Sequence, residues 1–125
     1  MIKLTISEIL NAAPVLTKLT NQTFSGAATF KIARLLKALD KEITIFEETR
    51  TKMVQDYGEK DEKGILIEKD GNIRVMPDKI ETFNNEINAL LKSEVEINSE
   101  KLSIDYFENI ELTPMEASLI EVVVE

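Results

Sequence analysis

A row of basic residues, starting one turn into a predicted helix, is the group in this sequence best suited to bind an anion. Ser25 and Gly26 stand at the start of that helix, where free backbone N–H groups can hold a phosphate. Four cations, which we call the basic stripe, follow three or four residues apart and so share one side of the helix: Lys31, Arg34, Lys37 and Lys41. The glycine and lysine spacing of a P-loop is absent. The stripe therefore predicts either a solvated, acid-paired helix flank or an anion-binding groove that includes Ser25 and Gly26.

A second group of charged residues matches a calcium-binding loop only in part. From Glu59 to Asp70, the first and third positions are the acids Glu59 and Asp61, and the sixth is Gly64. The fifth position is Lys63, whose cation repels calcium, and the twelfth is Asp70 instead of a bidentate glutamate. We therefore expect a solvated turn here, and neither a metal nor another cofactor.

The composition removes the commonest catalytic groups. The 125 residues include no His and no Cys, so neither an imidazole base nor a thiol nucleophile is present. The many carboxylates show no spacing that marks out a catalytic pair. We expect a protein that is not an enzyme and that works by binding other molecules.

Charge is divided unevenly along the chain, whose formal net charge is −8. Residues 1–41 hold six cations and two anions, whereas residues 76–125 hold three cations and twelve anions. The two parts can neutralise each other within one fold, or they can present a basic patch and an acidic tail to different partners. Because the chain as a whole is acidic, binding to nucleic acid is not expected. We predict that the basic stripe pairs with the acidic C-terminal half.

The N-terminal segment predicts a strand followed by a helix. Residues 2–5 alternate between apolar and polar side chains, as a half-buried strand does. A helix is expected over about 7–20, capped by Ser7 and either kinked or split by Pro14.

The longest apolar pattern predicts a helix over about 26–57, capped by Ser25 and followed by Gly58 as its C′ residue. Its apolar positions alternate in steps of four and three residues and form a seam: Ile32, Leu36, Leu39, Ile43, Phe46, Arg50, Met53 and Tyr57. A second helix is expected over 77–92 as its antiparallel mate, but that helix spans only about 24 Å against about 45 Å. The uncovered seam predicts a homodimer or larger assembly, with an intramolecular partner as the alternative. The candidate interface residues are Leu39, Ile43, Phe46, Arg50, Met53 and Tyr57.

Turn and capping residues divide the remaining chain. A β-hairpin is expected at about 65–75, turning at Asp70 and Gly71, before Pro77 starts the second helix. A strand is expected at 94–97 and a short turn at 104–107.

A capping box, in which Thr113 is followed by Pro114 and then by Glu116, predicts a short C-terminal helix. Beyond it, residues 119–124 are too densely apolar for one helical face. The C-terminal segment is therefore expected to dock on the core or on a partner.

Three stretches, in this order and at this spacing, carry a family resemblance: Phe30–Glu42, Tyr57–Gly64 and Ile110–Glu116. Together they resemble the DUF1617-like group of small proteins encoded by bacteriophages and prophages of Gram-positive bacteria. The resemblance covers most of the chain. It implies an accessory or structural role in a phage, and it brings no catalytic motif whose residues could be transferred.

These observations predict one α+β domain over residues 1–125, dominated by a long helix packed antiparallel on a second helix, with a hairpin between them and short terminal elements. The expected function is that of a non-enzymatic phage accessory or assembly protein acting through protein–protein contacts. The alternative is an anti-defence protein that sequesters a small nucleotide or binds a host defence protein. The expected partners are a phage or host protein and further copies of the chain. No membrane is expected, since no apolar run reaches about 18 residues, and the expected location is the host cytoplasm or the virion.

Overall fold

The structure, a computed structural model, describes residues 1–69 and 72–125 of the chain. The contacts between these residues fall into two units. Unit 1 consists of Met1–Ile43 and Lys92–Glu125, and unit 2 consists of Thr44–Leu91. Most of the described residues are helical, and the strands that accompany the helices are short and antiparallel, so the predicted α+β class is confirmed.

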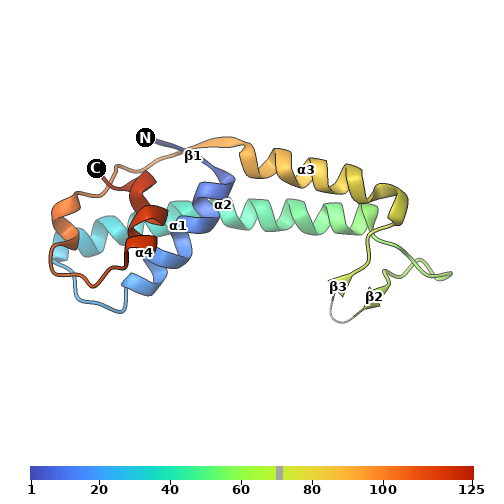
Figure 1. Ribbon diagram of the computed structural model, residues 1–125, viewed down its shortest axis with the longest axis horizontal. Coiled ribbons are helices and arrows are strands. Elements are labelled where there is room, and N and C mark those ends of the chain that lie inside the picture. The colour runs from blue at the N-terminus through green and yellow to red at the C-terminus, as the bar shows by residue number, and fades with distance from the viewer. Residues whose placement is uncertain (70–71) are drawn as a thin grey trace. The chain divides into compact units, whose positions relative to one another are not determined.

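The sheet of unit 1 pairs the N-terminal strand with a strand that lies far along the sequence. Strand β1 (Ile2–Thr5) pairs antiparallel with β4 (Glu94–Ile97), so that Leu4 lies opposite Val95 (Figure 1). Ile2 and Leu4 are buried, as the alternating pattern of the sequence requires. Both strands have their predicted bounds, and their pairing brings the segment after Ile97 back beside the N-terminus.

Helix α1 (Ile6–Leu19) starts earlier than predicted, because its cap is Thr5 and not Ser7. The backbone N–H of Glu8 donates to the Thr5 hydroxyl at 3.1 Å, and the N–H of Thr5 donates to the Glu8 carboxylate at 2.9 Å. This reciprocal box satisfies two backbone donors together, which Ser7 cannot do. The prediction that Pro14 could split the helix is also wrong. Buried apolar residues lie on both sides of the exposed Pro14 and hold both halves of the helix on the same core.

Helix α2 (Gly26–Tyr57) has the predicted bounds, and its 32 residues run through both units. The hydroxyl of Ser25 accepts from the N–H of Ala28 at 3.3 Å, which confirms the predicted cap. Within unit 1 the helix buries one face, and its buried residues recur at helical spacing: Ala28, Ile32, Leu35 and Leu39.

The C-terminal segment of unit 1 docks on the core. A 3₁₀ turn (Ile104–Phe107), helix α4 (Pro114–Ile120) and a final 3₁₀ turn (Glu121–Val123) follow one another, and α4 packs against α1. Val123 is fully buried, and its carbonyl accepts from the N–H of Leu102 at 2.8 Å. The predicted turn at 104–107 is therefore confirmed, and of the two predicted alternatives for the C-terminus, the core or a partner, the structure shows docking on the core.

The predicted capping box at the start of α4 forms with both of its bonds. The N–H of Glu116 donates to the Thr113 hydroxyl at 3.2 Å, and the N–H of Thr113 donates to the Glu116 carboxylate at 3.1 Å. Pro114 occupies the first helical position, where no backbone N–H is needed. The local pattern alone therefore determines where α4 begins.

Unit 2 contains the predicted hairpin. Strands β2 (Glu68–Lys69) and β3 (Asn72–Ile73) pair antiparallel, and the two expected turn residues, Asp70 and Gly71, lie outside the described part of the chain. The segment after α2 pairs with both sides of this hairpin through two isolated antiparallel bridges, Gly58 with Val75 and Lys60 with Leu66.

Gly58 follows α2 for a different reason from the one predicted. Its φ is not positive, so it is not a left-handed C′ residue. A Cβ atom at this position would lie 2.5 Å from the carbonyl oxygen of Val54 and 2.6 Å from the Leu66 side chain. Glycine is required because the returning chain passes close to the helix end. Among the glycines that the structure describes, Gly64 is the one with positive φ, at 78°.

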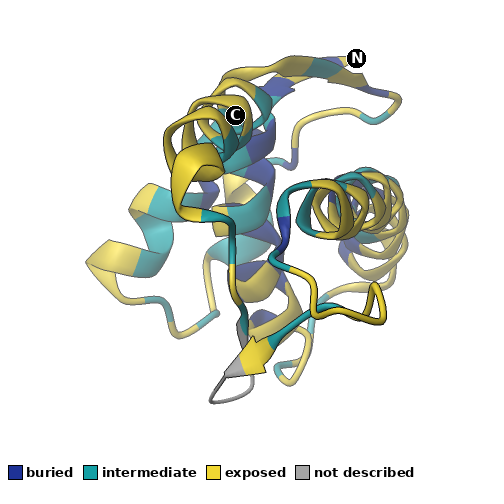
Figure 2. Ribbon diagram, turned by 90° about the vertical axis from the view of Figure 1, so that its right-hand side faces the viewer, coloured by how far each residue is buried: buried dark blue, intermediate teal, exposed yellow. Residues whose placement is uncertain are grey.

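Helix α3 (Ile80–Lys92) follows a 3₁₀ turn at Pro77–Lys79 and, within unit 2, runs opposite to the last turns of α2 (Figure 1). The rings of Tyr57 and Phe83 meet edge to face with centroids 6.2 Å apart, which confirms the predicted antiparallel helix pair. No residue of α3 is buried, and Figure 2 shows the helix in the colours of exposed and intermediate residues.

Candidate functional site

Two residues of the basic stripe, Lys31 and Arg34, line a cavity of about 410 Å³ in unit 1. The pairing of β1 with β4 brings the other lining residues to the same place: Met1, Asn98, Ser99 and Glu100. The Asn98 amide thus joins two cations, which suits an anion. The Ser99 hydroxyl, however, donates to the carbonyl of Glu100 at 3.3 Å, and the Glu100 carboxylate reduces the positive charge of the site.

The other four predicted anion ligands do not reach this cavity. Ser25 lies at the start of α2, where its hydroxyl accepts from the N–H of Ala28, and Gly26, Lys37 and Lys41 are exposed elsewhere along α2; none of the four lines the cavity. Sequence spacing placed the six residues on one element correctly, but the cavity depends on the segment after β4, which the stripe itself does not reveal.

The prediction that the basic stripe pairs with the acidic C-terminal half is wrong. Among the described residues, no carboxylate oxygen lies within 4.0 Å of the charged nitrogens of Lys31, Arg34, Lys37 or Lys41. The pairs between the two halves are made by other cations: Lys3 with Glu94 at 3.8 Å and Lys18 with Glu116 at 3.0 Å. The stripe remains exposed on the outer side of α2, and Lys31 places its ammonium 5.9 Å from the centroid of the Tyr106 ring.

The predicted interface along α2 is largely covered by the chain itself. Leu39 and Phe46 are buried, with 0% and 8% of their surface exposed. The hydroxyl of Tyr57 donates to the Glu86 carboxylate at 2.8 Å, and this bond raises the pKa of the tyrosine above its ordinary value. Ile43 and Met53 are half-buried, and Arg50 is exposed. The seam is therefore not the bare apolar strip on which the expectation of self-association depended.

A more open apolar surface lies at the C-terminal end of unit 1, and the sequence did not single it out. It is a cavity of about 420 Å³ between the turn at Ile104–Phe107, helix α4 and the last residues of the chain. Its apolar lining comes from these separate segments: Ile104, Phe107, Leu112, Ala117, Ile120 and Val124. Ile120 is only 2% exposed and belongs to the core, whereas Ile104 is 66% exposed at the edge. We call this surface the acid-rimmed cavity.

Acidic residues surround that cavity. Glu121 and Glu125 line it, and residues 102–125 include six acids and no cation. Of the six, Glu116 is neutralised by Lys18. The hydrogen bond from the Thr113 backbone, followed by the bond to Lys18, holds the pKa of Glu116 below its ordinary value. The exposed Glu121 and Glu125 take part in no ion pair within the described chain, so the rim keeps its negative charge.

A third cavity, of about 850 Å³, lies between the end of α1 and the start of α4, and its polar groups bond to one another. The Gln22 amide donates to the carbonyl of Glu111 and accepts from its N–H, both at 2.9 Å. Lys18 and Glu116 form their ion pair in the same place. These bonds hold α1 and α4 together, which is a structural role.

In the segment that partly matches a calcium loop, a turn forms around residues 62–64. The Asp61 carboxylate accepts from the N–H groups of Lys63 at 2.8 Å and Ile65 at 3.0 Å. In the part of the chain that the structure describes, no three His, Cys, Asp or Glu side chains gather as metal ligands. Among these same residues, no helix is both long and apolar enough to cross a membrane.

Comparison with known proteins identifies no relative of the chain. No protein-family model, no curated protein and no solved structure matches the chain. Its function must therefore be argued from its own surfaces.

Proposed function

We propose that the protein acts through non-catalytic protein–protein contacts, with the acid-rimmed cavity of unit 1 as its contact surface. The observation that carries this proposal is the exposure of Ile104, 66% of whose surface is open, beside an apolar cavity of about 420 Å³. Contiguous apolar surface rimmed by polar residues is typical of interaction sites. The absence of His and Cys from the sequence favours binding over catalysis.

We further propose that these contacts serve a bacteriophage, as those of an accessory or assembly protein in the host cytoplasm or the virion. This setting is supported by the resemblance of three stretches of the sequence to small phage proteins. The phage setting and the contact surface are separate proposals, and either one can fail without the other.

The proposal is tested by capture of partners from phage-infected cells with three tagged forms of the chain. The wild type and Met115→Asp should retain the same partner, because Met115 is 70% exposed on α4 but does not line the cavity. Ile104→Asp should lose it, because a carboxylate at the apolar edge must be desolvated on contact. Identical partners for all three forms would show that the cavity is not the contact surface.

The basic cavity supports a second candidate function, the sequestering of a small nucleotide. Lys31 and Arg34 stand there beside the amide of Asn98, a set that can hold phosphate oxygens. Binding to the native state raises stability by about 2.7 kcal/mol when the ligand is at a hundred times its Kd. Nucleoside triphosphates and cyclic dinucleotides should then raise Tm in the wild type and not in Arg34→Ala. An unchanged Tm with both ligand classes removes this candidate.

A further inference from the structure

We infer that the chain associates with itself head to tail, and that Phe30 and Arg34 of one copy dock in the acid-rimmed cavity of the next. The inference rests on the contact surface proposed above and identifies its occupant as a second copy of the chain. Both faces belong to unit 1, and no residue of unit 2 takes part in the contact.

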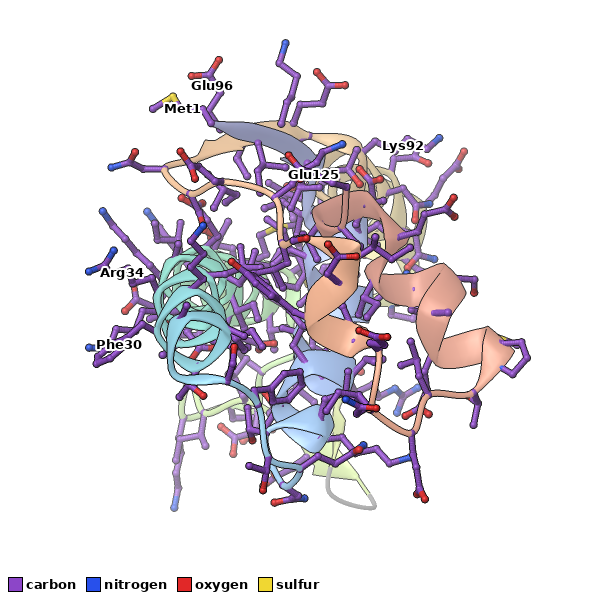
Figure 3. All side chains as sticks on the ribbon, turned by 90° about the vertical axis from the view of Figure 1, so that its left-hand side faces the viewer. Met1, Phe30, Arg34, Lys92, Glu96 and Glu125 are labelled. Carbon is purple, nitrogen blue, oxygen red and sulfur yellow. The ribbon has the colours of Figure 1, made fainter. Side chains whose placement is uncertain are left out.

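The docking face is an exposed aromatic residue surrounded by cations. Phe30 is 70% exposed, since it stands two residues from both Ala28 and Ile32 and therefore opposite the buried side of α2. Arg34 follows one turn later on the same side, and Figure 3 shows both side chains pointing away from the helix. Lys31 lies between them in sequence. Aromatic residues and arginine are the commonest anchors of protein interfaces.

The receiving face has the complementary shape and charge. Its apolar cavity of about 420 Å³ offers Phe107 and Val124 as walls and the buried Ile120 as part of its floor. Glu121 and Glu125 supply carboxylates that no cation of the described chain neutralises. An aromatic ring would be covered by the apolar lining while the neighbouring guanidinium meets the acids at the edge.

The charges of unit 1 favour a second copy over an unrelated protein. The exposed cations of the basic stripe lack a carboxylate partner among the described residues, and so do the acids of the cavity. Neither face covers the other within one chain, because Phe30 and Ile104 are both largely exposed in it. Contact between two copies would cover Phe30 of one copy and Ile104 of the other, and it would bring the basic stripe against the acids of the cavity.

The two faces are different surfaces, so the interface is heterologous. Each copy can donate one face and receive another, which builds a ring if the rotation closes and a filament if it does not. A symmetric dimer along α2 is less suited to the chain, because Leu39 and Phe46 are already buried. This geometry leads to a specific test that a symmetric dimer would not pass.

The test uses two variants that each lose one face. Phe30→Glu with Arg34→Glu removes the docking face, and Ile104→Asp with Glu121→Lys removes the receiving face. In sedimentation velocity at micromolar concentration, the wild type should exceed 14.2 kDa and each variant alone should sediment as one copy. An equimolar mixture should form a two-copy species, because each variant retains the face that the other has lost.

Each outcome decides the inference. A mixture that stays at one copy, or a wild type that does so, overturns it, and association by either variant alone would show another interface. Met115→Asp is the matched control and should associate like the wild type. Raised salt should weaken association at least about tenfold, because charge pairs at the edge are screened. If a double variant loses its helical circular dichroism, the exposed single changes Arg34→Glu and Glu121→Lys replace it.

The same measurements separate this inference from the proposed function. A wild type that sediments as one copy, yet captures a partner that Ile104→Asp loses, refutes self-association and leaves the cavity as a contact surface. A wild type that associates through these two faces, but captures nothing else, identifies the second copy as the partner.

Discussion

Unit 1 and unit 2 share one long helix but bury its side chains to very different extents. In unit 1, α2 buries a continuous face from Ala28 to Leu39, each of whose four buried residues is at most 4% exposed. Among the described residues of unit 2, Phe46 is the one buried apolar residue, and none of the residues of α3 is buried. A regular apolar pattern along a helix therefore predicts the helix, but not how much of its face is covered.

The difference indicates where the free energy of folding resides. Unit 1 has a core supplied by its sheet, α1, α2 and the C-terminal segment, whereas unit 2 relies on short antiparallel backbone pairings and half-buried contacts such as Tyr57 with Phe83. Regions with few buried apolar contacts open at lower free energy than the core. We therefore expect unit 2 to exchange its amide hydrogens before unit 1 does.

The largest effect should come from emptying the core of unit 1. Leu35 is 0% exposed, and Leu35→Ala should lower the free energy of unfolding by about 2–5 kcal/mol, because it removes transfer energy and leaves a cavity. Leu90 of α3 is half-buried, and the matched change Leu90→Ala should cost about 1 kcal/mol. Urea unfolding of both variants measures the difference. Equal losses of unfolding free energy would contradict the difference in burial between the two units.

A smaller effect, confined to unit 2, is expected at Gly58. Gly58→Ala places a Cβ against the Val54 carbonyl and the Leu66 side chain, and the strain should cost about 1–3 kcal/mol. Hydrogen exchange should accelerate in residues 58–76 while α1 keeps its protection. Gly26→Ala is the control, since a Cβ there meets nothing within 4 Å and should be neutral or stabilising. Faster exchange throughout unit 1 would mean that the two units unfold together.

Local signals in the sequence predict the helices well. The bounds of α2 follow from apolar residues at helical spacing between Ser25 and Gly58, and the start of α4 follows from the reciprocal bonds of Thr113 and Glu116. Each of these signals is confined to a few neighbouring residues or to one period. The error at α1 has the same origin, because two adjacent candidates, Thr5 and Ser7, compete and the reciprocal bond with Glu8 decides between them.

Contacts between distant segments are not carried by such signals. The role of Gly58 depends on how closely Leu66 returns, and the acid-rimmed cavity depends on three segments that stop short of covering Ile104. The sequence shows that the basic stripe lies on one face of a helix. It does not show that Glu94 and Glu116 form ion pairs with Lys3 and Lys18 and not with the stripe. The role of Gly58, the cavity and the ion pairs all depend on tertiary packing. The distances between segments that are far apart in the chain cannot be inferred from one sequence.

The smallest effect is expected from a change of pH, and it concerns Glu116 in unit 1. The folded protein holds the pKa of this carboxyl below its ordinary value, because the Thr113 backbone N–H and then Lys18 bond to the charged form. A lowered pKa means that the charged form stabilises the fold above the ordinary value, about 4.3. This contribution is lost as the pH falls through the lowered pKa. Glu116→Gln should therefore be less stable than the wild type at neutral pH, and the gap should close on acidification.

Urea unfolding across that pH range measures the gap, with Glu108→Gln, an exposed change in the same segment, as the control for loss of a negative charge. The physical reason for a local effect is that the Glu116 bonds join the start of α4 to Lys18 of α1, both within unit 1. Hydrogen exchange should accordingly rise in α4 and at the end of α1 in Glu116→Gln, and stay unchanged in residues 58–76. A gap that persists below the lowered pKa would show that Glu116 stabilises the fold by packing and not by charge. Faster exchange at 58–76 would instead show that the stability of unit 2 depends on the α1–α4 contact.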